Sequence, residues 1–162
     1  MEKNEHLLGT RRFLPMFVTQ FFGALNDNVY KQSLLLVITY GLINQQSASV
    51  STLNNLAALL FILPYFIFSA TAGQIADKYE RSQLVRGIKI LEIVIMLIGS
   101  AGFLLGHLWL LLTALFLMGV HSTFFGPIKY AILPEILRPN ELMSGNALFQ
   151  SGTSIAILIG MI

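Results

Sequence analysis

Five long apolar runs follow one another along this chain and restrict its fold to one that crosses a lipid bilayer. They cover residues 13–43, 53–75, 84–105, 108–133 and 143–162. About 20 mostly apolar residues in a helix cross the hydrocarbon core of a bilayer, and each run meets that length. Only 11% of the residues are charged, against about 25% in a soluble domain. The sequence therefore predicts an all-α membrane protein with five transmembrane helices.

Positively charged residues concentrate on alternate connections between these runs. The N-terminal segment and the second and fourth connections carry Lys3, Arg11, Arg12, Lys78, Arg81 and Arg138. The first and third connections, residues 44–52 and 106–107, contain no Lys or Arg. Because cytoplasmic connections hold the excess of Lys and Arg, this pattern predicts a multi-pass protein with a cytoplasmic N-terminus. The fifth run ends without an interfacial anchor, and we expect residues 1–162 to be the N-terminal part of a longer protein.

The chain has few of the residue patterns that support catalysis or metal binding. It contains no Cys, which excludes disulfides and thiolate metal sites. Neither His-Glu-x-x-His, typical of zinc peptidases, nor the acyltransferase pattern His-x-x-x-x-Asp occurs. We therefore expect no enzymatic activity, metal or cofactor within these residues.

A polar cluster lies inside the first apolar run. Residues three and four apart share a helix face, which aligns Gln20, Gly23, Asp27, Tyr30 and Lys31, with Asn26 and Asn28 on the flanks. A carboxylate and an ammonium at membrane depth need a partner or a water-filled cavity. Two interpretations stay open: a structural ion pair between Asp27 and Lys31, or a stripe that faces a central cavity.

The fourth run contains a second polar cluster around Gly126 and Pro127, with Ser122, Gly126 and Lys129 nearly on one face. Pro127 predicts a kink near residue 123. Lys129 either extends to the membrane interface or contacts a cavity or an anionic headgroup, and His121 either bonds a neighbouring helix or carries a proton. In transporters built from inverted three-helix repeats, interruptions at equivalent positions of spans one and four indicate the substrate site. The two clusters therefore favour transport.

The third run holds Lys89 and Glu92, three residues apart near its cytoplasmic end. For Lys89 we expect extension to the interface. Glu92 either pairs with Lys89 or a neighbouring helix, or serves as a coupling-proton site.

The second connection resembles the loop signature of the major facilitator superfamily, G-x-x-x-D-[RK]-x-G-[RK]. Gly73, Asp77, Lys78 and Arg81 match the signature, whereas Glu80 replaces its second glycine. The resemblance implies a loop that latches the two halves of a transporter. From the residues alone we expect Gly73 to permit a close approach and Asp77 to face or cap the N-terminus of a helix.

Residues 20–31 and 125–135 resemble the bacterial lysophospholipid transporter family, a branch of the major facilitator superfamily. The resemblance covers essentially the whole chain and implies a fold of about twelve helices, of which residues 1–162 form a partial N-terminal transporter domain. It implies flipping of lysophosphatidylethanolamine-type lipids from the outer to the inner leaflet of the bacterial inner membrane for reacylation. The implied partners are membrane lipids, a C-terminal transporter half and a fused or separate acyltransferase.

A lysophospholipid headgroup offers a phosphate and often an ammonium. The resemblance implies that Asp27 and nearby polar groups contact it, with the ammonium at Asp27 and the phosphate at Lys31 or Lys129. The complete set of expected binding residues is Gln20, Asn26, Asp27, Asn28, Lys31 and Lys129. The alternative function is proton-coupled transport of a small solute or drug on the same fold.

Overall fold

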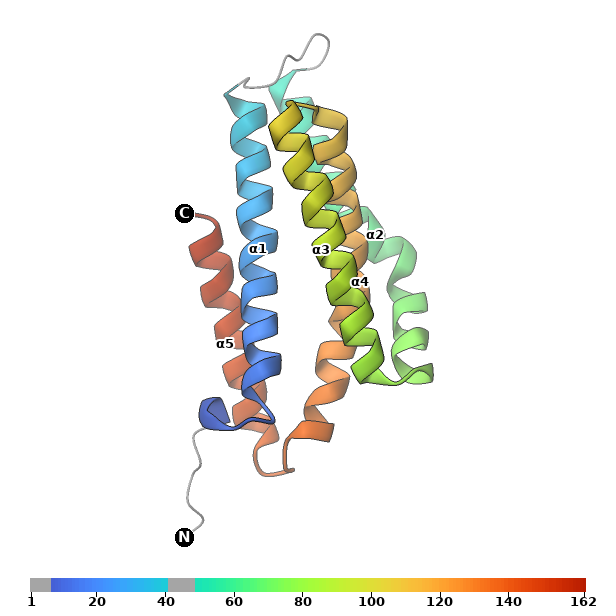
Figure 1. Cartoon of the computed structure of the whole chain (residues 1–162), viewed down its shortest axis with the longest axis vertical. Coiled ribbons are helices and arrows are strands. Elements are labelled where there is room, and N and C mark those ends of the chain that lie inside the picture. Colours follow the sequence, from blue (N-terminus) through green and yellow to red (C-terminus); the bar gives the residue numbers. More distant parts are fainter. Residues whose placement is uncertain (1–6, 41–48) are drawn as a thin grey trace. The chain divides into compact units, whose positions relative to one another are not determined.

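The chain folds into helices throughout the part that the structure describes. The structure is a computed structural model and describes residues 7–40 and 49–162 (Figure 1). A short 3-10 helix, η1 (Leu7–Gly9), precedes α1 (Leu14–Thr39), α2 (Val50–Lys78), α3 (Arg81–Leu105), α4 (Leu108–Ile136) and α5 (Leu142–Gly160). No β-strand occurs among these described residues. The predicted all-α fold class is confirmed.

Four of the long helices, α2 to α5, are long and apolar enough to cross a membrane. Helix α1 is not among them, although its 26 residues exceed the length that a bilayer requires. The polar residues between 26 and 31 lower its hydropathy. Membrane crossing by α1 therefore stays a prediction from its sequence.

Both polar clusters lie inside continuous helices. The prediction treated the clusters as interruptions of two spans, but α1 runs unbroken past Asn26 and Asp27, and α4 continues through Pro127 to Ile136. Polar side chains leave the backbone hydrogen bonds of a helix intact, and a proline removes only one of them. The polar clusters therefore interrupt the apolar character of the two helices but not their backbone structure.

The connection between α2 and α3 is shorter than the sequence predicts. Only Tyr79 and Glu80 separate the two helices, so Gly73, Asp77 and Lys78 belong to α2 and not to a loop. The expected close approach at Gly73 is wrong, because a Cβ there would meet no atom within 4 Å. The expected cap is also wrong: Asp77 is exposed in the last turn of α2, and Glu80 occupies the N-cap position of α3.

The expected tight turn at residues 106–107 joins α3 to α4. Gly106 has a φ of 61° and ends α3 in the left-handed conformation, which glycine adopts without steric cost. The N–H of His107 then donates to the carbonyl of Gly102 at 2.9 Å. This turn returns the chain antiparallel, and Leu111 of α4 contacts α3 at Gly102.

The chain divides into two compact units, which are described separately. The terminal unit (Met1–Gln32 and Ile132–Ile162) contains the first part of α1, the end of α4 and α5. The central unit (Ser33–Ala131) contains the end of α1, α2, α3 and most of α4.

Small residues bring α5 against α1 in the terminal unit. The buried residues of α5 are Gly145, Phe149, Gly152, Ala156 and Gly160. A Cβ at Gly152 would lie 2.6 Å from the ring of Phe17, and one at Gly160 would lie 2.9 Å from the carbonyl oxygen of Leu25. Small residues at intervals of four let membrane helices approach closely. This stripe determines which face of α1 packs on α5, and it was not among the features predicted from the sequence.

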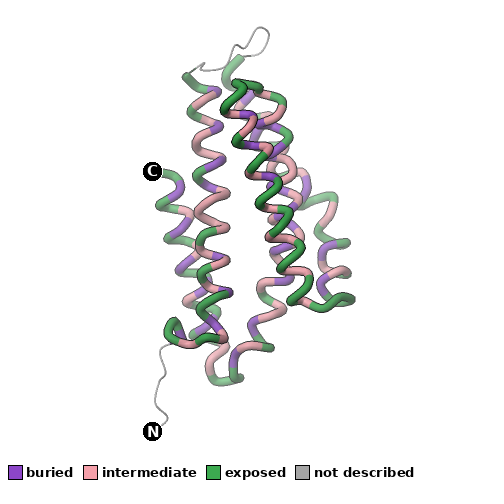
Figure 2. Tube along the Cα trace, viewed as in Figure 1, coloured by how far each residue is buried: buried purple, intermediate pink, exposed green. Residues whose placement is uncertain are grey.

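In the central unit α4 is the most enclosed helix. In the most apolar 18-residue stretch of α4, 50% of the residues are buried, compared with 17% in the corresponding stretches of α2 and α3. Figure 2 shows the burial of each residue along the chain. A Cβ at Gly119 would lie 2.5 Å from the carbonyl oxygen of Phe61, and the neighbouring Pro64 of α2 is fully buried. Helices α2 and α4 therefore pack backbone to backbone at Gly119.

Candidate functional site

The charged residues of α1 lie together on one stretch of helix in the terminal unit. Asn26, Asp27 and Lys31 are half-buried, and the Oδ1 atom of Asp27 is fully buried. The opposite charges of Asp27 and Lys31 interact across one helical turn. Tyr30, on the same stripe, is 6% exposed. This arrangement offers a carboxylate and an ammonium side by side, which is complementary to a zwitterionic group.

Two amide side chains of α1, those of Gln20 and Asn28, are buried and hydrogen-bonded. The Nε2 atom of Gln20 donates to the hydroxyl of Thr153 in α5 at 3.0 Å, and Asn28 donates to the carbonyl of Ala24 at 2.7 Å. Asn28 also lies against α5, where its Cβ atom would contact a side chain at Gly160. Gln20 and Asn28 thus hold the position and rotation of α1 relative to α5.

Lys129, the remaining expected binding residue, lies on α4 in the central unit. Its side chain is half-buried, and its Nζ atom lies 5.1 Å from the ring centroid of Tyr130, within the range of a cation–π contact. Both expected roles of Lys129, at the interface or at a headgroup, stay predictions.

Among the residues of the loop signature, Arg81 makes a contact between helices. Its Nη1 atom donates to the carbonyl of Ala131 at 3.0 Å, which joins the start of α3 to α4 within the central unit. Asp77 and Lys78 are exposed, and the Nζ atom of Lys78 lies 5.7 Å from the ring centroid of Tyr79. The signature residues thus lie at the α2–α3 end of the central unit, and the expected latch stays a prediction.

A second group of charged and aromatic side chains lies on α3 and α4. It consists of Lys89, Glu92, His121 and Phe125 and is called the α3–α4 cluster. The Nζ atom of Lys89 lies 2.6 Å from Oε2 of Glu92, and Nε2 of His121 lies 3.4 Å from the same oxygen. The Lys89 ammonium also lies 4.5 Å from the ring centroid of Phe125. Among the alternatives for Glu92, the pair with Lys89 and the contact with a neighbouring helix both occur.

Lys89, Glu92 and His121 are each notable in the sequence, but no sequence pattern predicts that His121 contacts the other two. The pairing of Lys89 with Glu92 is local and follows from their spacing of three. The approach of His121 depends on the rotation of α4 against α3, which the tight turn at Gly106 and the Gly102–Leu111 contact determine. The available signal was the presence of ionisable groups in two consecutive apolar runs.

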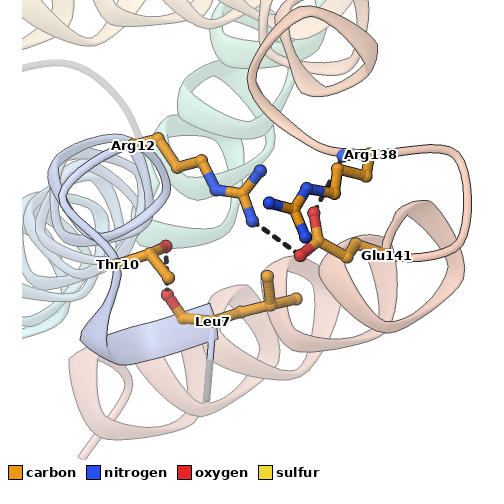
Figure 3. Close-up of polar contacts among 5 residues, drawn as sticks. All are labelled: Leu7, Thr10, Arg12, Arg138 and Glu141. Atoms are coloured by element: carbon orange, nitrogen blue, oxygen red, sulfur yellow. Dashed lines mark hydrogen bonds and ion pairs between the residues drawn. The ribbon is translucent and has the colours of Figure 1, made fainter. Parts of the chain in front are cut away.

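An ion pair outside the apolar helices ties the chain before α1 to the segment before α5 (Figure 3). The Nη2 atom of Arg12 lies 2.6 Å from Oε1 of Glu141, whose Oε2 accepts a hydrogen bond from the backbone N–H of Arg138 at 2.8 Å. The Arg138 N–H and the Arg12 guanidinium hold the pKa of the Glu141 carboxyl below its ordinary value of 4.5. The positions of Arg12 and Arg138 in the sequence indicate membrane orientation, and no sequence pattern predicts this contact.

The lowered pKa of Glu141 predicts a pH-dependent contribution to stability. A carboxyl group whose pKa is lower in the folded state stabilises that state above about pH 4.5 and loses this effect as the pH falls through the folded-state pKa. We expect Glu141→Gln to lower the melting temperature at pH 7, with a difference that disappears below the lowered pKa. Thermal unfolding between pH 3 and 7 measures this, and a difference independent of pH would contradict it. Glu80→Gln, an exposed substitution of the same kind, is the control.

Apolar helices that carry charged side chains within them define a class of protein. Four helices long and apolar enough to cross a membrane, with an ion pair inside α3, are typical of multi-pass membrane proteins that bind polar solutes or ions. The sequence profile of the Major Facilitator Superfamily matches residues 16–162. The chain belongs to this superfamily of membrane transporters, so the fold expected from the sequence motifs is confirmed.

Curated relatives of this chain carry a common name. It is 30% identical to the lysophospholipid transporter LplT of Cronobacter sakazakii, 29% to that of Serratia proteamaculans and 31% to that of Pectobacterium carotovorum, each over 156 residues. These matches cover 94% of this chain and 35–36% of the relatives. The chain thus spans about a third of their length. No solved structure matches the chain.

Proposed function

We propose that this chain is part of a transporter that moves lysophospholipids of the lysophosphatidylethanolamine type across the bacterial inner membrane. The proposed direction is from the outer to the inner leaflet, where the lipid is reacylated. The charge pair of Asp27 and Lys31 on α1 carries the proposal, because these groups match the two charges of such a headgroup. The similarity to transporters named for lysophospholipids supports the same substrate.

The residues of α1 take different roles in this proposal. Asp27 accepts from the ammonium of the headgroup, and Lys31 donates to its phosphate, with Asn26 as a further polar contact. Gln20 and Asn28 position these groups from the α5 side through the hydrogen bond to Thr153 and the contact at Gly160. Lys129 on α4 is the alternative partner of the phosphate. The whole transporter includes a C-terminal half and acts with a fused or separate acyltransferase.

The proposed orientation places the N-terminus in the cytoplasm. The Arg12–Glu141 pair then lies on the cytoplasmic side, together with Lys78 and Arg81. The charge distribution supports this arrangement, since Lys and Arg accumulate on cytoplasmic connections.

Lysolipid uptake tests the proposal directly. Spheroplasts that express the full-length protein receive radiolabelled lysophosphatidylethanolamine in the outer leaflet, and its conversion to the diacyl lipid reports arrival inside. We expect conversion to depend on the transporter. Uptake of a soluble solute driven by a pH gradient, without lysolipid conversion, would contradict the proposal. That result would favour proton-coupled solute transport, the alternative that the Glu92–His121 contact supports.

A further inference from the structure

The α3–α4 cluster contains a carboxylate and an aromatic ring, the two groups that recognise an alkylammonium ion. The ammonium of Lys89 lies between them. The Lys89 ammonium lies 2.6 Å from the Glu92 carboxylate and 4.5 Å from the centre of the Phe125 ring. A carboxylate and an aromatic face together are a common recognition site for ligand cations. The cluster therefore resembles a binding site for a ligand ammonium, in which the side chain of Lys89 takes the position of the ligand.

His121 adds a buried polar group beside this site. The imidazole is 3% exposed and stacks on Phe125 with 6.1 Å between ring centroids. Neither ring nitrogen makes a hydrogen bond within the described residues, although Nε2 lies 3.4 Å from Oε2 of Glu92. Buried polar groups without a hydrogen bond are rare in native proteins and call for an explanation. A polar ligand at the cluster supplies one.

We propose that the α3–α4 cluster is a binding site for a zwitterionic headgroup that carries both an ammonium and a phosphate. The ligand ammonium replaces that of Lys89 between Glu92 and Phe125, and the released Lys89 pairs with the ligand phosphate. His121 then donates to a phosphate oxygen. The side chains of Lys89 and Glu92 are 21% and 13% exposed, so both charged groups are partly open to the surface of the central unit.

The exchange leaves no uncompensated charge at membrane depth. The Lys89–Glu92 pair is neutral overall, and a phosphate–ammonium zwitterion is neutral too. The exchanged state therefore contains two complete ion pairs. An anionic headgroup without an ammonium would release Lys89 and leave Glu92 with only the His121 imidazole beside it, and a buried charge that loses its ion-pair partner is strongly unfavourable. The site should thus select an ethanolamine headgroup over a glycerol headgroup. This selectivity rests on the proposed lysolipid function and assigns a further set of residues to it, on α3 and α4.

Equilibrium binding tests the site without requiring transport. The full-length protein in nanodiscs binds radiolabelled lysophosphatidylethanolamine or lysophosphatidylglycerol, and the dissociation constant of each is measured by scintillation proximity. We expect Glu92→Gln to weaken binding of the ethanolamine lipid by about tenfold and binding of the glycerol lipid by less than about threefold. Glu92→Asp keeps the charge and should restore the selectivity.

Two further variants separate this site from the stripe on α1 and from effects of misfolding. Repeating the measurement in Asp27→Ala removes the α1 contribution, and the effect of Glu92→Gln should persist there. Glu80→Gln is the control, because Glu80 is exposed on the α2–α3 connection. Equal weakening of both lipids, no weakening of either, or no binding of the ethanolamine lipid to the unmodified protein would overturn the proposal. Absence of transport with this binding selectivity intact would contradict only the proposed function.

Discussion

Replacement of Asp27 by Ala is expected to abolish lysolipid transport while the protein still inserts into the membrane. Asp27 is half-buried with its Oδ1 atom fully enclosed, and its charge interacts with that of Lys31. Loss of a charge-assisted hydrogen bond to the headgroup ammonium costs about 3 kcal/mol at a partly buried site, which corresponds to about a hundredfold loss of rate. The conversion of radiolabelled lysophosphatidylethanolamine in spheroplasts measures the effect.

Two variants make the Asp27 result interpretable. Asp27→Asn keeps the shape and removes the charge, so an equal loss assigns the effect to the carboxylate. Val18→Ala shortens an exposed side chain on the same helix and should retain transport. Normal transport by Asp27→Ala, with the variant present in the membrane at wild-type levels, would contradict the proposed role of Asp27 in transport. Asp27 would then serve only in helix packing, as a structural ion pair with Lys31.

Replacement of Gly119 by Ala is expected to destabilise the packing of α2 against α4. The added Cβ would lie 2.5 Å from the carbonyl oxygen of Phe61, and backbone at this position cannot rotate away as a side chain does. Overpacking of this kind typically costs about 1–3 kcal/mol. The midpoint of SDS-induced unfolding of the purified protein measures the loss.

Gly126→Ala is a matched control for Gly119→Ala. Both glycines lie in α4, so both substitutions gain about 1 kcal/mol of helix propensity. A Cβ at Gly126 meets no atom within 4 Å. We therefore expect Gly126→Ala to be as stable as the unmodified protein or more stable. If the two variants unfold at the same midpoint, the close contact at Gly119 does not contribute to stability.

The prediction of the α2–α3 connection illustrates the limit of reading helix ends from composition. The sequence placed residues 76–83 in a charged loop because charged residues end an apolar run. In the structure, α2 reaches Lys78 and α3 begins at Arg81. A helix continues through charged residues once their side chains reach the membrane–water interface. Charged residues therefore mark where the hydrocarbon core of the membrane ends, and not where the helix ends.

The amino-acid sequence alone indicates an all-α membrane protein of the Major Facilitator Superfamily and locates the charged residues along the helices. Length, hydropathy and local spacing suffice for this, because a bilayer admits few backbone structures and residues three or four apart always share a helix face. It thereby included the Lys89–Glu92 pair, which the structure contains, among the alternatives for Glu92. The charge pair on α1 was likewise readable from a spacing of four.

Which helix faces meet is visible only in the folded chain. The close approach of α5 to α1 depends on glycines whose missing side chains are visible only once the partner helix is in place. The hydrogen bond from Gln20 to Thr153 and the contact of His121 with Glu92 join residues far apart in sequence. Their meeting requires a particular rotation of each helix, which close packing determines. For that reason the α3–α4 cluster, unlike the pair on α1, emerged only from the folded chain.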